Sequence, residues 1–391
     1  MISVLIASKE RPQQLHRCLV SDYIAMTPQA ARIAHNEIFP TCTYGYIIVH
    51  MSITGRRLTK KHSMRFSIVI PTKNRISPLL TLIRSLQLQQ YPASDFEIII
   101  VNNDAKTDIA EQLKHITHGI HSMRVVAMKT SGPSYARNYG YLLTRYEHVI
   151  FLDDDVRVSP NFLSAYALAW HQHPNAAIVG GRIIPDKNIY GNTPEIREKR
   201  RHLIKKYDWI YASVDFGKKS MRLAINDLLC SAALCVNKKL MPRNKPLFNT
   251  LFGATHMGIL IFSEDFELCN RLMLKGKEVW YAANVIAVHQ FGQNRFAPSY
   301  IIKRHILAGA ENFLMNISLT RTHPSFSSLT FANRLWVSIK KMVRGVDDYY
   351  LHQFKDPLFI IFFVSYFTLG PILYVVTNSA STTKKGPLLI Q

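Results

Sequence analysis

The chain has 391 residues, of which 48% are hydrophobic, enough for one large domain with appendages or two modest ones. Its formal net charge of +22 favours a polyanionic partner, such as an anionic membrane surface, a phosphorylated ligand or nucleic acid. We find no zinc knuckle, helix-turn-helix or aromatic RNA-binding pattern, so we expect no nucleic-acid partner. Five scattered cysteines argue against a disulfide framework and for a reducing compartment.

Residues 1–64 are interpreted as an N-terminal extension of unclear fold. The apolar run Ile2–Ala7 is too short for a signal peptide and is typical of a strand. Its strand-and-turn pattern recurs at 66–75, so the extension is either a partial duplicate of that opening unit or a chance match between short apolar strands. No hydrophobic period is sustained between residues 22 and 63.

Residues 65–300 alternate between short apolar runs and amphipathic stretches, which predicts parallel βαβ units in an α/β fold. Strands are expected at 66–70, 96–101, 124–128, 148–152 and 177–180, and helices near 77–89, 107–116 and 134–144 and from Pro160 onward. This is a Rossmann-like nucleotide-binding sheet flanked by helices. Because Gly-x-Gly-x-x-Gly is absent, a dinucleotide site is unsupported.

The second part of this domain is less regular. A basic, aromatic stretch at 190–219 favours a loop or lid, and 252–263 a glycine-containing connection. Strands are expected at 228–236 and, as one or two segments, at 279–289. Between them, Ser263 is placed to cap a helix that runs to Lys275 and ends before Gly276.

The C-terminal part predicts contact with a membrane. Residues 301–356 form a basic region whose stretch 331–345 has the pattern of an amphipathic helix on an anionic surface. Residues 357–377 contain no charge and are long enough to span a bilayer, with a tail at 378–391. Gly370-Pro371 predicts a kink or a re-entrant hairpin, and a buried core helix is the alternative. We therefore expect the cell membrane as the location, with the catalytic domain on its cytoplasmic side.

Acidic side chains follow the predicted strand at 148–152. Asp153, Asp154 and Asp155 would repel one another unless a cation lies between them, and oxygen ligands on a tight turn suit Mg²⁺ or Mn²⁺. An acidic turn after a strand is the alternative. Further along, Glu264-Asp265 begins a predicted helix, where carboxylates are also ordinary helix-start residues.

These motifs occur in order with Ile70–Arg75, Asn103-Asp104 and Ser131–Asn138, and together they closely resemble the family 2 glycosyltransferases of the GT-A fold over about 65–295. The resemblance implies Asp265 as the catalytic base and Asp155 and His289 as metal ligands. It also implies a nucleotide-sugar pocket with contacts from Pro71, Thr72, Arg75, Asp104, Arg137, Asp153 and Asp154. Asn103 stands where the family usually has an acid, which leaves the base preference open.

The implied function is an inverting, metal-dependent transfer of a sugar from a nucleotide-sugar donor to a hydroxyl. A saccharide or lipid-linked acceptor in cell-envelope polysaccharide or glycolipid synthesis fits the basic, apolar C-terminal part. The chemistry agrees, because a cation stabilises a leaving diphosphate and a positioned carboxylate accepts the proton of the incoming hydroxyl. Alternatives are a nucleotidyltransferase, although its Gly-rich loop with a lysine is missing, and a non-catalytic membrane-surface protein with a degenerate transferase domain.

Overall fold

The computed structural model describes two compact units, within 1–63 and 64–391. The described residues are 2–7, 46–51, 64–104, 109–113, 116, 120–243, 245–256, 259–322 and 356–382. In the first unit, β1 (Ile2–Ala7) pairs antiparallel with β2 (Tyr46–Met51). The sequence predicted the first of these strands and missed the second. The duplication of the opening unit stays a prediction.

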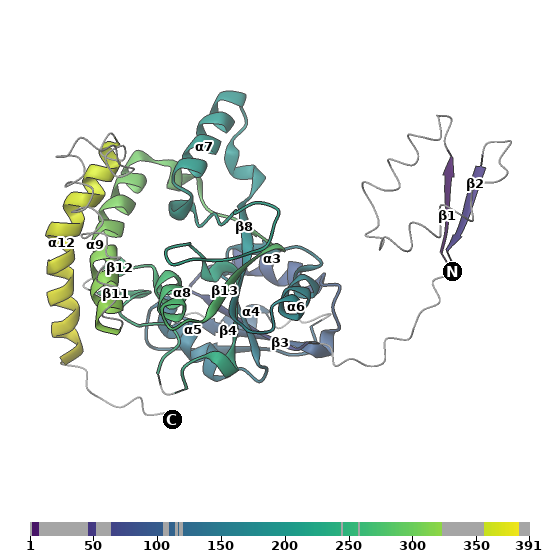
Figure 1. Ribbon diagram of the computed structural model, residues 1–391, viewed down its shortest axis with the longest axis horizontal. Helices are drawn as coiled ribbons and strands as arrows, with labels where there is room; N and C mark the ends of the chain where they lie inside the picture. The colour runs from purple at the N-terminus through teal and green to yellow at the C-terminus, as the bar shows by residue number, and fades with distance from the viewer. Residues whose placement is uncertain are drawn as a thin grey trace. The chain divides into compact units, whose positions relative to one another are not determined.

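The second unit is built on a nine-stranded sheet (Figure 1). Its strand order is β5-β4-β3-β6-β10-β8-β13-β7, and β9 pairs with β13 off this path. The strands are β3 (Phe66–Thr72), β4 (Phe96–Asn102), β5 (Met123–Ala127), β6 (His148–Phe151), β7 (Val156–Val158), β8 (Ala176–Pro185), β9 (Met221–Arg222), β10 (Leu234–Asn237) and β13 (Glu278–His289).

The strands in the first half of the sheet pair in parallel, as the alternation of predicted strands and helices indicated. The strands β5, β4, β3 and β6 run in the same direction, and β3 and β4 are buried along their whole length. Strand β10 then runs antiparallel to both β6 and β8, so the complete sheet is mixed. The predicted α/β architecture is confirmed, and the carboxyl ends of β3, β4 and β6 meet at one edge of the sheet.

Helices cover the sheet and extend from it. They are α3 (Ile76–Gln87), α4 (Ile109–Leu113), α5 (Pro133–Leu142), α6 (Phe162–Gln172), α7 (Pro194–Lys206), α8 (Glu264–Leu274), α9 (Pro298–Thr322) and α12 (Pro357–Thr382). Apolar spacing explains how they pack; in α3 it buries Leu79, Leu82, Ile83 and Leu86. Short 3₁₀ turns lie at 93–95, 187–190, 208–211, 231–233, 238–240 and 293–296.

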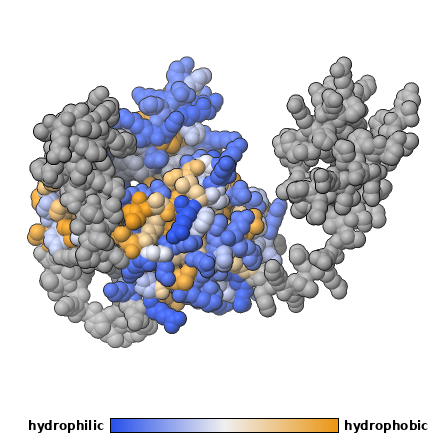
Figure 2. Space-filling view, viewed as in Figure 1, coloured by the Kyte–Doolittle hydropathy of each residue, from blue (hydrophilic) through white to orange (hydrophobic). Residues whose placement is uncertain are grey.

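The prediction of a loop at 190–219 is wrong for its first half, where α7 forms. Thr193 caps this helix by accepting a hydrogen bond from the Ile196 backbone N–H at 3.3 Å, and Pro194 occupies its first turn. The polar composition reflects exposure, and Figure 2 shows α7 as a hydrophilic projection. Its last turn is anchored because Ile204 and Tyr207 are buried with neighbouring apolar side chains.

Two further segments differ from expectation. The connection 252–263 contains an antiparallel hairpin, β11 (Ala254–His256) and β12 (Ile259–Ile261). The expected strand at 228–236 begins only at Leu234, because a 3₁₀ turn occupies 231–233. Both stretches are apolar, and short apolar runs do not distinguish strands from buried turns.

The helix expected at 263–275 is present as α8, but Ser263 does not cap it in the usual way. Its φ of 75° is left-handed, and its hydroxyl donates to Glu311 at 3.3 Å instead of accepting from the helix backbone. The end was predicted correctly, since Gly276 follows the helix with a φ of 73°. The pair of Glu267 and Arg271 at helical spacing forms an ion pair of 2.9 Å.

The last described helix, α12, continues through Gly370 and Pro371, so the re-entrant hairpin is wrong. Within the described residues, the part from Pro357 to Val375 is the one helix whose length and composition would suffice to cross a bilayer. The amphipathic helix expected at 331–345 lies outside the described residues.

Gly140 lets α5 approach the sheet closely. A Cβ there would clash with Val69 and lie 3.0 Å from Val101 Cγ2. We expect Gly140→Ala to lower the free energy of unfolding by about 1–3 kcal/mol, since overpacking outweighs the gain in helix propensity. Urea denaturation measures this effect. Leu142→Ala, at an exposed position of the same helix, should change stability by no more than about 0.5 kcal/mol. Equal stability of the glycine variant and the native protein would contradict the close approach.

Candidate active site

A cleft of about 1150 Å³ opens at the edge where β3, β4 and β6 end, the usual position for ligands in open α/β sheets. Nine of the predicted site residues line it: Pro71, Thr72, Arg75, Arg137, Asp153, Asp154, Asp155, Asp265 and His289. The structure therefore brings together residues from the first strand, the acidic triplet, the helix α8 and the end of β13.

Asp104 is the exception among the predicted residues, because it is not part of the cleft lining. Its Oδ2 accepts a hydrogen bond from Asn74 Nδ2 at 2.5 Å. The neighbouring Asn103 lines the cleft instead, and its Oδ1 accepts from the Gly132 backbone N–H at 3.3 Å. Asn103 thus faces the cleft, whereas Asp104, the predicted contact to the nucleotide base, is not part of its lining.

Asp154 is the most buried member of the acidic triplet, with a side chain 1% exposed. Its carboxylate accepts from Thr72 Oγ1 at 2.7 Å and from Arg75 Nε at 3.2 Å. Burial raises the pKa of Asp154 to about 6, although Arg75 and the Thr72 hydroxyl act in the opposite direction. With both of its oxygens engaged by these neighbours, Asp154 holds Thr72 and Arg75 in place.

Asp155 lies in a cationic environment. Arg75 Nη1 is 2.8 Å from its Oδ2, His289 Nε2 is 3.5 Å from its Oδ1, and Arg295 Nη2 is 4.0 Å away. Burial alone would raise the pKa of Asp155, but the hydrogen bond and charge of His289, together with the two arginines, lower it below its usual range. The positive groups around Asp155 therefore favour its ionised form.

His289 is oriented by a backbone carbonyl. Its Nδ1 lies 2.9 Å from the Tyr211 oxygen, and because a carbonyl only accepts, Nδ1 carries the hydrogen. Nε2 then faces Asp155 Oδ1 at 3.5 Å, and the contact of Nδ1 with a backbone carbonyl is the arrangement that orients histidines at metal sites.

The pair formed by Asp155 and His289 fits one divalent ion. Ligands at about 2.1 Å from a shared ion lie up to about 4 Å apart, so the 3.5 Å between Asp155 Oδ1 and His289 Nε2 is compatible. In the described part of the chain, no group of three or more His, Cys, Asp or Glu side chains could hold a metal. An ion bound here would keep several positions for phosphate oxygens and water, as Mg²⁺ commonly does.

Arg137 ties three elements together at the floor of the cleft. This buried guanidinium on α5 lies 2.6 Å from Asp153, which follows β6, and forms a second ion pair with Glu264 at the start of α8. Burial raises the pKa of Glu264, and the charge of Arg137 opposes that rise. Because Arg137 is already engaged by two acids, it acts as a brace between the triplet and the helix that carries Asp265.

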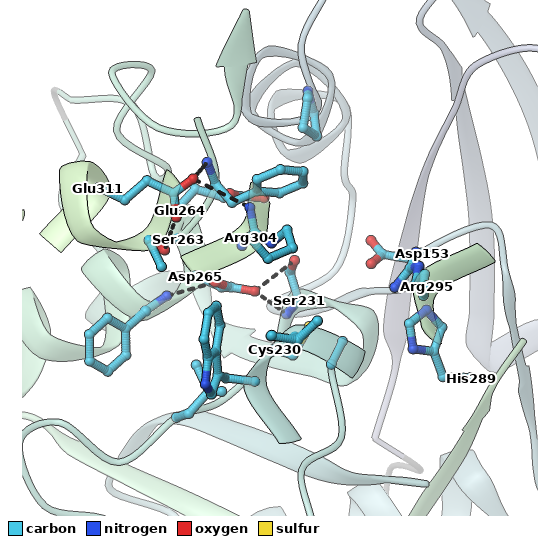
Figure 3. Close-up of a pocket in the computed structure, with 18 of the residues that line it drawn as sticks. Asp153, Cys230, Ser231, Ser263, Glu264, Asp265, His289, Arg295, Arg304 and Glu311 are labelled. Carbon is cyan, nitrogen blue, oxygen red and sulfur yellow. Dashed lines mark hydrogen bonds and ion pairs between the residues drawn. The ribbon is translucent and has the colours of Figure 1, made fainter. Parts of the chain in front are cut away.

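Asp265 is held in the first turn of α8. Its Oδ2 accepts from the Ser231 backbone N–H at 2.8 Å and from Ser231 Oγ at 3.2 Å, and its Oδ1 accepts from Phe266 N–H at 2.8 Å. Figure 3 shows Asp265 beside Ser231, with Asp153, Arg295 and His289 on another side of the view. The helix dipole stabilises the negative charge at this position.

Sequence reasoning missed several lining residues. Ser231 interrupts the apolar run at 228–236, a signal that was available in the sequence. Arg295 follows His289 closely but carries no motif. Arg304 and Glu311 lie on α9, where Arg304 stacks over the Phe262 ring at 4.3 Å and Glu311 accepts from the Phe262 N–H at 2.9 Å.

The other half of the cleft differs in character from the acidic half. It is lined by the 3₁₀ turn at 208–211 and by the first turns of α9 and α12, with Trp209, Tyr300, Phe359 and Phe362 among its side chains. Lys206 at the end of α7 is 2.8 Å from Asp356, just before α12. An aromatic, partly cationic wall therefore faces the acids.

Removing one member of the Arg137–Glu264 ion pair should destabilise the folded protein. We expect Arg137→Met to lower the free energy of unfolding by about 3–5 kcal/mol at pH 8, because it leaves Glu264 buried without a partner. In the unfolded chain Glu264 ionises near its ordinary pKa, whereas in the folded variant buried Glu264 stays protonated up to a higher pH. The folded variant is therefore most stable at low pH, and its free energy of unfolding falls as the pH rises. Urea titrations should therefore show a smaller loss at pH 5 than at pH 8.

The matched control is the double variant Arg137→Met/Glu264→Gln, which should recover part of the stability at pH 8 because no unpaired carboxylate remains at that position. A loss in Arg137→Met that is independent of pH, with no recovery in the double variant, would contradict the pairing.

Comparisons with known proteins match part of the chain to a known family. Residues 67–229 match the model of the family described as glycosyl transferase family 2. Poly(ribitol-phosphate) β-N-acetylglucosaminyltransferase TarS of Staphylococcus aureus is 27% identical over 141 residues, which cover 34% of this chain and 24% of TarS. The pre-mycofactocin glycosyltransferase of Mycobacterium tuberculosis is 26% identical over 232 residues, 57% of this chain and 42% of that protein. The chain thus spans less than half the length of these relatives.

Solved structures with similar chains include two glycosyltransferase complexes. The mannosyltransferase PcManGT from Pyrobaculum calidifontis, in complex with GDP-Man and Mn²⁺, has a TM-score of 0.46 and 15% identity, over 83% of this chain and 89% of that one. TarS 1–349 from S. aureus, in complex with UDP-GlcNAc, has a TM-score of 0.44 and 16% identity, over 71% and 78%. Residues 67–229, fewer than half of the chain, thus resemble glycosyl transferase family 2.

Proposed function

We propose that the protein is an inverting glycosyltransferase that moves a sugar from a nucleotide-sugar donor to a hydroxyl of a saccharide or lipid-linked acceptor. The observation that carries the proposal is the shared cleft of Asp155 and Asp265, which come from distant parts of the chain. The family match of residues 67–229 supports the reaction class. The same proposal places the enzyme at the cytoplasmic face of the cell membrane, in envelope polysaccharide or glycolipid synthesis.

The donor would lie along the edge formed by Pro71, Thr72 and Arg75. Arg75 keeps its side chain 49% exposed while it is bonded to Asp154 and Asp155, so its guanidinium can still donate to a diphosphate. Asp153 is 26% exposed and is available for the nucleotide, whereas buried Arg137 supports Asp153 from below. We therefore propose that Asp153 contacts the nucleotide and that Arg137 holds Asp153 in position.

The leaving diphosphate gains negative charge as the glycosidic bond breaks. A divalent cation at Asp155 and His289 would supply Lewis-acid stabilisation of that charge. The side chains of Arg75 and Arg295 surround the same carboxylate and contribute positive potential to this end of the cleft.

Asp265 is assigned as the general base. The hydrogen bonds from Ser231 and Phe266 fix the orientation of its carboxylate. The acceptor hydroxyl would approach from the aromatic half of the cleft, transfer its proton to Asp265 and form the new bond at the anomeric carbon. A single base acting opposite the leaving group implies one displacement and inversion of configuration.

The alternative functions have less support. A nucleotidyltransferase would use a glycine-rich loop after the first strand, whereas the turn that lines the cleft here is Pro71–Arg75. A non-catalytic membrane-surface protein would have no need for Ser231 to orient Asp265 within the cleft.

We expect Asp265→Asn to retain donor binding and to lose transfer by about 10²–10⁴-fold, the usual contribution of a general base. Asparagine keeps the size of the side chain, and its oxygen can still accept from Ser231, but it cannot accept the proton. Isothermal titration with a nucleotide-sugar and a transfer assay separate the two effects. Asp215→Asn, whose carboxylate pairs with Arg182 outside the cleft, serves as the matched control and should transfer normally. Near-native turnover by Asp265→Asn would refute the assignment.

Removal of a divalent ion from the proposed site at Asp155 and His289 should reduce sugar transfer. We expect EDTA to abolish transfer and added Mn²⁺ or Mg²⁺ to restore it, because the donor diphosphate needs a counter-charge beyond the arginines. The shift in melting temperature caused by a nucleoside diphosphate should increase with Mn²⁺ in the native protein but not in His289→Ala. Full transfer activity in EDTA would contradict a metal requirement, and an unchanged shift in His289→Ala would contradict this ligand.

A further inference from the structure

The helix α12 exposes a continuous apolar face. Six large apolar side chains on it are between 39% and 62% exposed: Ile360, Val364, Phe367, Leu369, Ile372 and Val375. The helix carries no charged residue over its 26 residues. Exposed apolar surface of this extent marks an interaction site.

The opposite face of α12 packs on α9. Ser365 Oγ donates to the Ile306 carbonyl at 2.5 Å, and Asn316 Nδ2 donates to Tyr366 Oη at 2.8 Å. Gly309 allows the two backbones to approach, since a Cβ there would clash with the Phe362 carbonyl. Apolar contacts continue to Leu373 and Tyr374 near the C-terminal turns of α9. At 1.5 Å per residue, the stretch 362–374 holds α12 against α9 over about 18 Å.

The far side of α9 is fixed to the catalytic domain along the same stretch (Figure 1). Glu311 accepts from the Phe262 N–H at 2.9 Å, and Asn249 Nδ2 donates to Ser318 Oγ at 3.2 Å. Leu314 and Leu319 are buried in one cluster with Phe252. Beyond the first turns of α12, the polar catalytic domain is therefore separated from this helix by the thickness of α9, about 10 Å.

This packing conflicts with a helix that crosses a bilayer. A spanning helix is surrounded by hydrocarbon about 30 Å thick, and the domain behind α9 would have to enter that layer with its polar backbone and charged side chains. A helix lying in the plane of the interface avoids the conflict, because one face meets lipid and the other meets protein. We propose that α12 lies flat on an anionic bilayer, with its apolar face in the lipid and the catalytic domain remaining in water.

A bilayer suits this face better than a protein partner does. The exposed side chains include no charged group that would fix the orientation of a partner, and the net charge of +22 attracts anionic lipid. The cleft also borders the same element, since Phe359 and Phe362 of α12 line its aromatic half. Docking through α12 would therefore place the cleft beside the lipid headgroups.

The test uses the full-length protein and sealed vesicles of phosphatidylcholine with or without phosphatidylglycerol. We expect flotation with the anionic vesicles, and at least tenfold weaker binding for Val364→Glu/Ile372→Glu, which puts two charges on the apolar face. The matched control is Leu88→Glu/Leu168→Glu, which changes two exposed leucines, one directly after α3 and one on α6, and should bind as the native protein does. Equal binding by both double variants would overturn the proposal.

A second measurement distinguishes a flat helix from a spanning one. An epitope tag after Gln391 should be removed by protease added outside sealed, protein-coated vesicles, because both ends of a flat α12 stay on the side of the catalytic domain. A protected tag, released only after detergent, would show a span and refute the flat orientation. Absence of vesicle binding, with self-association in sedimentation experiments that Val364→Glu/Ile372→Glu abolishes, would assign this face to a second copy and would also refute it.

Discussion

The buried Arg137 guanidinium is the interaction on which the rest of the site depends. Its ion pairs with Asp153 and Glu264 connect the end of β6 to the beginning of α8, segments more than a hundred positions apart in sequence. Without this charge, the two acids would face each other in a buried region, where like charges repel strongly. The guanidinium thus lets the acidic triplet and Asp265 share one cleft.

The acids in this cleft are held in different ways, and this difference separates their roles. Asp154 is buried against Thr72 and Arg75, and the pKa of its carboxyl is raised, whereas the pKa of Asp155 is lowered by His289 and the arginines around it. Neighbouring carboxyls with pKa values shifted in opposite directions are typical of functional sites. Asp265 differs again, because the hydrogen bonds it accepts come from Ser231 and from the first turn of its own helix.

The sequence predicted the parallel half of the fold and nine of ten site residues in the cleft, because βαβ periodicity and strand-end acids are local signals. For Ser231 it offered only a polar interruption of an apolar run, and for Arg304 no signal, because their roles depend on contacts with Asp265 and Phe262 formed in the folded chain. It misread α7 as a loop because a helix that is polar on nearly all sides lacks the apolar stripe on which prediction relies. Ser263 was placed at the right position with the wrong conformation, since its left-handed backbone depends on Glu311 and the preceding hairpin.

Composition alone favoured a spanning helix at the C-terminal end, and the packing of α12 on α9 is the basis of the in-plane orientation proposed for it. Hydropathy measures how favourably a segment enters lipid, but it does not register what is attached to the segment. Here Ser365 and Tyr366 form hydrogen bonds with α9, and Glu311 of α9 accepts from the Phe262 N–H just before α8, so a chain of contacts leads from α12 to α8. In the proposed orientation, a change in the position of α12 would act through α9 on the wall of the cleft where the acceptor is proposed to enter.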